Sequence, residues 1–165
     1  MSRAVTRVAE SWALAGGIIL LAIMAITSVN VAGFGLDRLA RLFGANISGL
    51  PGYEDVVRLS ISSAALMFLP WCQAQRGHVT VDLFGRAMPG RVRAALDRLW
   101  LGGIVLLCIF LGYWMTIGMI ETRSDNALSP VLGWPVWPFY LPGIVSLALW
   151  AAVAATQLKD RAHDA

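Results

Sequence analysis

The stretch LWLGGIVLLCIFLGYWMTIGMI, residues 99–120, runs for 22 residues without a charged side chain. A helix of roughly 20 apolar residues is long enough to cross the hydrocarbon core of a bilayer. Lipid offers backbone N–H and C=O groups no hydrogen-bond partner, so a spanning segment of this kind must be helical. The stretch predicts a transmembrane helix and places the chain among all-α integral membrane proteins.

Three further apolar runs of similar length accompany this one. They predict additional spans at about residues 13–34, 56–75 and 139–158. The composition agrees, because 58% of the 165 residues are apolar and 14% are charged, whereas a soluble domain has about 25% charged residues. We therefore expect residues 1–165 to form a single four-helix membrane domain.

The basic side chains are divided unevenly between the two sides of such a bundle. Nine of the 13 lysines and arginines fall on the side of the two chain ends, and four fall on the other side. Loops rich in lysine and arginine stay in the cytoplasm. The distribution predicts that both termini are cytoplasmic and that the connections at 35–55 and 121–138 face outward.

Two of the connections carry the pattern of short amphipathic helices. Leu36, Leu39 and Phe43 recur at helical spacing with charged residues between them, which predicts an outer interfacial helix at about 35–44. On the cytoplasmic side, a second interfacial helix is expected at about 79–88. The fold class is thus four transmembrane helices plus short amphipathic interfacial helices.

The cytoplasmic connection contains the densest group of polar residues. In QRGHVTVDLFGR, residues 75–86, the side chains of His78, Asp82 and Arg86 are spaced by four and share one face of a helix. Gly77 is suited to end the preceding span in a left-handed turn. His78 and Asp82 supply two metal ligands where structural zinc needs four, and no nucleophile accompanies them. We expect an interfacial structural element here, with no catalytic residue, metal or cofactor.

The spans themselves contain no ionisable residue near their midpoints. Buried ionisable groups usually mark transport pathways and proton relays, so we expect no transport pathway within this chain. Glu54, Asp55 and Arg58 stand at the outer mouth of the second span, and Glu54 and Arg58 are placed to pair at i,i+4. Small residues along the spans indicate close helix packing, either within the chain or against a membrane partner.

Three stretches, taken in order and spacing, resemble one known family. RGHVTVDL at 76–83 is similar to the signature of the DctQ-type small membrane subunit of tripartite ATP-independent periplasmic (TRAP) transporters. GYEDVVR at 52–58 resembles the acidic opening of that family's second span, and SPVLGWPVWPFYLPG at 129–143 resembles its entry into the fourth span. The connection at 35–50 departs from the family pattern.

The resemblance implies a scaffold subunit in the bacterial inner membrane. Its expected partners are a large membrane transport subunit of about twelve spans, a periplasmic substrate-binding protein and lipids, with no nucleic acid. The transported substrate would be a carboxylate, coupled to sodium. Candidate partner-interface residues are Glu54, Asp55, Arg58, Arg76, Gly77, His78, Asp82 and Arg86, and candidate periplasmic-face residues are Trp134, Pro135 and Trp137.

Two other functions are compatible with a small four-helix membrane protein. One is a membrane-anchor subunit of a respiratory enzyme complex, which a haem absorption spectrum would reveal. The other is a stand-alone small exporter, which would transport without any partner. A four-helix exporter is expected to carry an acidic residue inside its first span, and this chain has none there.

Overall fold

The computed structural model describes residues 3–44, 49–75 and 89–163. Within these residues, the regular elements are helices, and one isolated antiparallel bridge joins Leu128 to Pro135. The elements are α1 (Arg3–Arg41), α2 (Tyr53–Met67), α3 (Leu69–Ala74), α4 (Gly90–Ser124), the 3-10 helix η1 (Trp137–Tyr140) and α5 (Leu141–His163). Four helical stretches are long and apolar enough to cross a membrane, as expected.

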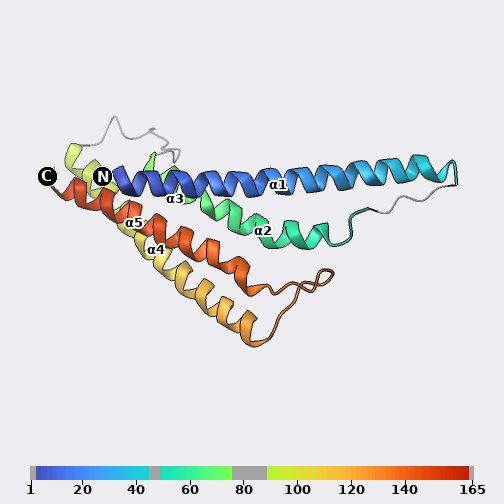
Figure 1. Ribbon diagram of the computed structural model, residues 1–165. Helices are drawn as coiled ribbons and strands as arrows, with labels where there is room; N and C mark the ends of the chain where they lie inside the picture. The colour runs from blue at the N-terminus through green and yellow to red at the C-terminus, as the bar shows by residue number, and fades with distance from the viewer. Residues whose placement is uncertain (1–2, 45–48, 76–88, 164–165) are drawn as a thin grey trace.

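The helices form a bundle in which both chain ends lie together (Figure 1). α4 and α5 pack against each other as an antiparallel pair, while α1 runs along α2 and α3. α2 and α3 also contact α5 and thereby join the two halves of the chain. We call the end where α1 begins and α5 ends the terminal end. The opposite end, which carries the connection at 125–136, is the loop end.

α1 is a single helix of 39 residues. No proline interrupts it, and the amphipathic segment after Phe34 continues the same helical path as far as Arg41. The structure therefore contradicts the separate outer helix predicted for residues 35–44. The amphipathic pattern marks the last turns of α1, where Arg41 pairs with Asp37 at 2.8 Å. This part of α1 reaches beyond the loop end of the other helices (Figure 1).

The second span consists of two helices instead of one. α2 ends at Met67, and α3 restarts at Leu69 with Pro70 in its first turn. Proline has no N–H to donate, and its ring clashes with the preceding helical turn. The helical pattern of backbone hydrogen bonds resumes at Cys72, whose N–H donates to the Phe68 carbonyl at 2.9 Å. The helices on both sides of the break, α2 and α3, pack against α5.

The third and fourth spans carry the main apolar core. α4 begins directly after Pro89, a residue suited to the N-terminal boundary of a helix. η1 leads without interruption into α5. Facing residues of the two helices form one buried cluster, which consists of Leu101, Ile104, Cys108, Leu147, Trp150 and Ala154. The second predicted interfacial helix, at 79–88, lies outside the described residues.

Candidate functional site

Asp55 lies in the first turn of α2 at the loop end of the bundle. Its side chain is only 5% exposed. The Oδ2 atom accepts hydrogen bonds from the backbone N–H groups of Val131 and Leu132, each at 2.8 Å. Hydrogen bonds to an ionised carboxylate are stronger than those between neutral groups. One carboxylate thus fastens the α4–α5 connection to the start of α2.

The connection that Asp55 holds is itself folded into a compact turn. Ser129 N–H donates to the Trp134 carbonyl at 2.8 Å, and Trp134 N–H donates to Ser129 Oγ at 3.0 Å. Gly133 N–H donates to the Ser129 carbonyl at 3.1 Å with a φ of 65°, a left-handed conformation that glycine adopts without strain. These hydrogen bonds fix the shape of the turn, in which the backbone N–H groups of residues 131 and 132 point toward Asp55.

Gly52 brings this turn into close contact with α2. It precedes the helix with a φ of 81°. A Cβ atom at this position would stand 2.5 Å from Leu132 Cδ2, far inside van der Waals contact. Both the backbone conformation and the close approach therefore require glycine here. Gly52 allows the turn to pack closely against the start of α2, and Asp55 holds the same turn by hydrogen bonds.

The neighbours of Asp55 in the predicted set behave differently. Glu54 and Arg58 are both exposed. Glu54 accepts a hydrogen bond from Tyr53 Oη at 3.3 Å, and no ion pair between Glu54 and Arg58 occurs in this described part of the chain. The expected i,i+4 pair is therefore wrong. The exposed Glu54 and Arg58 side chains border the buried Asp55.

The aromatic candidates lie at the same end of the molecule. Trp134 is 47% exposed, and Pro135 forms the bridge to Leu128. The Arg123 guanidinium stands 5.1 Å from the centre of the Trp137 ring, which is within cation–π range. This contact ties the end of α4 to the start of η1.

The structure brings together two of the three stretches on which the family resemblance rests. Residues 52–58 and 129–137 are far apart in sequence, and the carboxylate of Asp55 joins them. The remaining candidates, Arg76, Gly77, His78, Asp82 and Arg86, lie outside the described residues. The loop end therefore forms one continuous candidate site.

A buried polar cluster near the terminal end escaped the sequence interpretation. Gln73 Nε2 donates to Gln157 Oε1 at 2.7 Å, and Gln157 Nε2 donates to the Gln73 carbonyl at 2.8 Å. Trp150 Nε1 donates to Gln73 Oε1 at 3.3 Å. All three side chains are buried. The available signal was a glutamine near the same end of two apolar runs, which is too common to be recognised as a pair.

Other buried polar groups also link separate elements. Trp12 Nε1 donates to Ser146 Oγ at 2.9 Å and joins α1 to α5. Ser63 Oγ donates to the Phe139 carbonyl and joins α2 to η1. Asn30 Oδ1 accepts the N–H of Leu50 at 2.9 Å and holds the following connection against α1. These contacts serve the packing of the bundle.

The described residues contain no group of three or more His, Cys, Asp or Glu side chains able to hold a metal ion. No curated protein and no solved structure matches the chain at a significant level. A family model does match, over residues 36–163, and it is described as the DctQ component of tripartite ATP-independent periplasmic transporters. The match covers more than half of the chain and includes the site at the loop end. The chain therefore belongs to the DctQ family of TRAP transporter membrane components.

Proposed function

We propose that this chain is the scaffold subunit of a sodium-coupled TRAP transporter that imports carboxylates. It binds and supports a large membrane subunit, which holds the substrate and sodium sites. A periplasmic binding protein delivers the substrate. Family membership supports the assignment to the transporter, and it favours this function over a respiratory anchor or a stand-alone exporter.

One observation carries the scaffold role. The buried polar side chains in the described residues each make a hydrogen bond to another part of the chain, and they are Asn30, Asp55, Ser63, Gln73, Ser129, Ser146 and Gln157. A substrate pathway needs polar or ionisable groups that face a cavity. Here these side chains hold helices and connections together, and among their buried atoms only Asn30 Nδ2 has no hydrogen-bond partner in the described residues. Their use supports a static subunit.

We further propose that the loop end faces the periplasm and the terminal end faces the cytoplasm of the inner membrane. The distribution of basic residues supports this orientation. It places Asp55 and the turn it holds on the side from which a binding protein delivers substrate. The exposed side chains of Glu54, Arg58 and Trp134 are then available to partners at that surface.

Reconstitution into proteoliposomes tests the proposal. Uptake of labelled dicarboxylates, keto acids and sugar acids would be measured under an inward sodium gradient. We expect uptake only when the large subunit, the binding protein and this chain are all present. The matched controls omit one component at a time or replace sodium by potassium.

Two results would contradict the scaffold role. Transport by this chain alone would assign it a pathway of its own. Equal uptake with and without this chain, at equal amounts of correctly inserted large subunit, would show that the large subunit needs no support. Co-purification of the two membrane subunits in mild detergent gives an independent measure of their association.

A further inference from the structure

We propose that the outward side of α4 is the surface on which a transmembrane helix of the large membrane subunit packs, and that this helix offers a hydrogen-bond acceptor to Trp114. The inference rests on the proposed function, because it takes the large subunit as the partner. It adds the surface of contact and the chemistry that the partner helix must supply.

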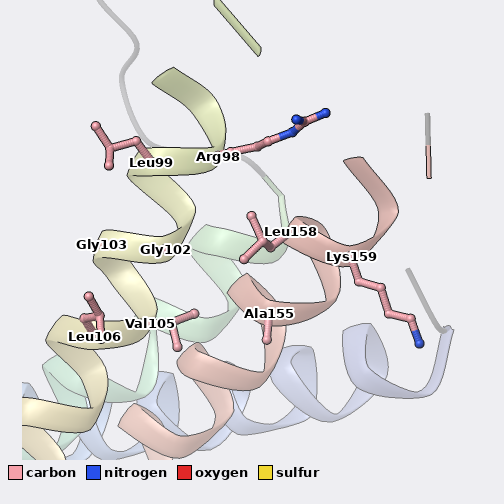
Figure 2. A pocket seen from close by; sticks show the side chains of 9 residues that line it. All are labelled: Arg98, Leu99, Gly102, Gly103, Val105, Leu106, Ala155, Leu158 and Lys159. Atoms are coloured by element: carbon pink, nitrogen blue, oxygen red, sulfur yellow. The ribbon is translucent and has the colours of Figure 1, made fainter. Parts of the chain in front are cut away.

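α4 lies at the edge of the bundle (Figure 1). Among the described elements, its backbone packs beside those of α5 and η1 but not beside those of α1, α2 or α3. Figure 2 shows the Val105 side chain directed toward α5, whereas Leu99 and Leu106 point away from it. Five large side chains that are 56–74% exposed make up what we call the outer face of α4: Leu99, Leu106, Phe110, Tyr113 and Trp114. No described part of this chain covers the outer face.

The depth of Tyr113 and Trp114 argues against lipid as their neighbour. Residues 99–120 carry no charge, and the middle of this run falls between residues 109 and 110. At 1.5 Å per residue, Tyr113 and Trp114 lie roughly 5–7 Å from the middle, well inside a hydrocarbon core of about 30 Å. Tryptophan and tyrosine prefer the headgroup level, where N–H and O–H groups find acceptors. Hydrocarbon offers no acceptor.

Trp150 shows how this chain accommodates a tryptophan inside a span. It is buried, and its Nε1 donates to Gln73 Oε1 at 3.3 Å. Trp114 instead makes edge-to-face ring contacts with Phe110 and Tyr113, whose ring centres lie 6.4 and 5.9 Å away. Neither the Trp114 N–H nor the Tyr113 hydroxyl forms a hydrogen bond within the part of the chain that the structure describes. Two neutral donors therefore lie side by side on the outer face.

Charge and hydrogen-bond complementarity identify the partner as a membrane helix. No charged side chain lies between Arg98 and Glu121, so a soluble protein with a charged surface would lose hydration there without gaining ion pairs. Two neutral donors require neutral acceptors, such as a hydroxyl or an amide carbonyl, and such groups link neighbouring transmembrane helices. The ester oxygens of lipids lie near the edge of the hydrocarbon core, roughly 15 Å from its middle, which is too distant.

The outer face continues into two grooves between α4 and α5. The first groove, near the terminal end, has a volume of about 670 Å³ and includes Leu99 and Leu106 in its wall (Figure 2). The second groove has a volume of about 340 Å³ and includes Tyr113. Helices pack by placing the side-chain ridges of one helix in the grooves of another. A helix on the outer face can therefore place its own side chains in these grooves.

Photo-crosslinking in bacterial membranes tests the assigned surface. Trp114 of the full chain is replaced by benzoylphenylalanine, and the chain is co-expressed with the large subunit and the binding protein. We expect ultraviolet light to join this chain covalently to the large subunit. Adducts only with a second copy of this chain, or only with lipid, would overturn the proposal.

Trp114→Phe tests the hydrogen bond, because it removes the indole N–H and keeps an aromatic ring. Fluorescence energy transfer between labelled subunits in proteoliposomes measures their association. We expect association to weaken roughly three- to tenfold, the usual effect of losing one hydrogen bond between membrane helices. Trp100→Phe is the matched control, because Trp100 lies on the same helix but roughly 14 Å from the middle of the span, where headgroups supply acceptors. It should change association by less than about twofold.

Gly103→Leu tests helix packing on the outer face. Gly103 precedes Phe110 by two helical turns, and a Cβ atom there would meet nothing within 4 Å in this chain. Lipid adapts to an added side chain, whereas a closely packed helix is displaced by it. The isolated variant should resist unfolding by sodium dodecyl sulfate as the wild type does, while its association with the large subunit weakens by about tenfold.

The outcomes separate this inference from the proposed function. If the wild-type subunits co-purify and position 114 forms no adduct with the large subunit, the assigned surface is wrong and the scaffold role stands. Wild-type association of Trp114→Phe or Gly103→Leu, or an equal loss in Trp100→Phe, also overturns the assigned surface. Failure of the wild-type subunits to associate would reject the proposed function, and this inference with it.

Discussion

At the scale of single residues, Asp55 is the most consequential side chain at the loop end. Its carboxylate accepts two backbone N–H groups from a turn that lies 76 and 77 residues further along the chain. Removing such an acceptor leaves both donors without their partner, and each unsatisfied buried group costs about 1–3 kcal/mol. Asp55 thus stabilises the loop end much more than the exposed charges beside it.

Replacing Asp55 by alanine should destabilise the chain by about 1–3 kcal/mol, since water reaches one flank of the turn and replaces part of the lost bonding. Asp55→Asn should cost less, because its amide oxygen still accepts a hydrogen bond. The measurement is thermal unfolding in detergent, followed by tryptophan fluorescence.

Glu54→Ala is the matched control for Asp55. Glu54 has the same charge and lies in the same helical turn, but its side chain is exposed. Its loss should change the free energy of unfolding by less than about 1 kcal/mol. Equal destabilisation by the two alanine variants would show that Asp55 acts only through its charge near the helix start.

Sequence could single out Asp55 but could not assign its role. The acidic opening of the second span predicted a functional residue at the outer mouth. Its partners are backbone amides, which have no signature in the sequence. The same reason hid the pairing of Gln73 with Gln157, which are 84 residues apart. Long-range pairs of ordinary polar residues depend on how the helices pack.

At the scale of helices, the contact between α1 and α2 depends on the absence of a side chain at Gly16. A Cβ atom there would lie 2.9 Å from Met67 Cβ and 3.2 Å from the Ala64 carbonyl oxygen. The two helices therefore approach closely at this point. Small residues allow such approach in membrane bundles, where packing replaces the hydrophobic effect as the driving force.

Gly16→Leu should push α1 away from α2 and destabilise the bundle by about 1–3 kcal/mol, the usual cost of overpacking a core. Gly17→Leu is the control, because a Cβ at Gly17 meets nothing within 4 Å. The resistance of the isolated chain to unfolding by sodium dodecyl sulfate distinguishes the two. Similar destabilisation by both variants would contradict the close contact at Gly16.

The sequence predicts the positions of the helices better than it predicts the connections between them. Uncharged runs such as 99–120 predict spans because the bilayer permits few alternatives. The break next to Pro70 follows from proline chemistry, but the apolar run continues through it and therefore predicts one helix. The amphipathic pattern at 35–44 fits both a helix lying on the surface and an extension of the first span. Periodicity alone does not distinguish a bend from a straight continuation.

At the scale of the whole molecule, α1 is much longer than the membrane is thick. Its 39 residues correspond to about 58 Å at 1.5 Å per residue, against a hydrocarbon core of roughly 30 Å. The excess lies partly at the loop end, where α1 passes the other helices (Figure 1). Exposed Leu36 and Leu39 lie on this projection, and exposed Phe43 follows its end at Arg41. Exposed apolar side chains beyond the hydrocarbon core can contact the lipid headgroup region or the surface of a partner protein.

Cysteine labelling tests both the projection and the orientation. In a chain whose Cys72 and Cys108 are replaced by alanine, a cysteine at Leu39 should react with a membrane-impermeant maleimide added to intact spheroplasts. A cysteine at Met24, which is also exposed on the bundle surface, should be protected by lipid. Reaction of the Leu39 variant only in inverted vesicles would reverse the proposed orientation.

The polar ties between the two halves of the molecule also have a consequence for its biosynthesis. The ribosome makes Asp55 76 residues before Val131, which amounts to about 4–15 s at roughly 5–20 residues per second. The hydrogen-bond partners of Ser63 and Gln73 are made 76 and 84 residues later, respectively. During translation, the second span thus enters the membrane with its packing against α1 available but before its polar contacts to the later elements exist. The contacts of Asp55 form once the connection between α4 and α5 is made, and those of Ser63 and Gln73 form only after η1 and α5 are made. The second span therefore reaches its final packing only when the fourth span has been translated.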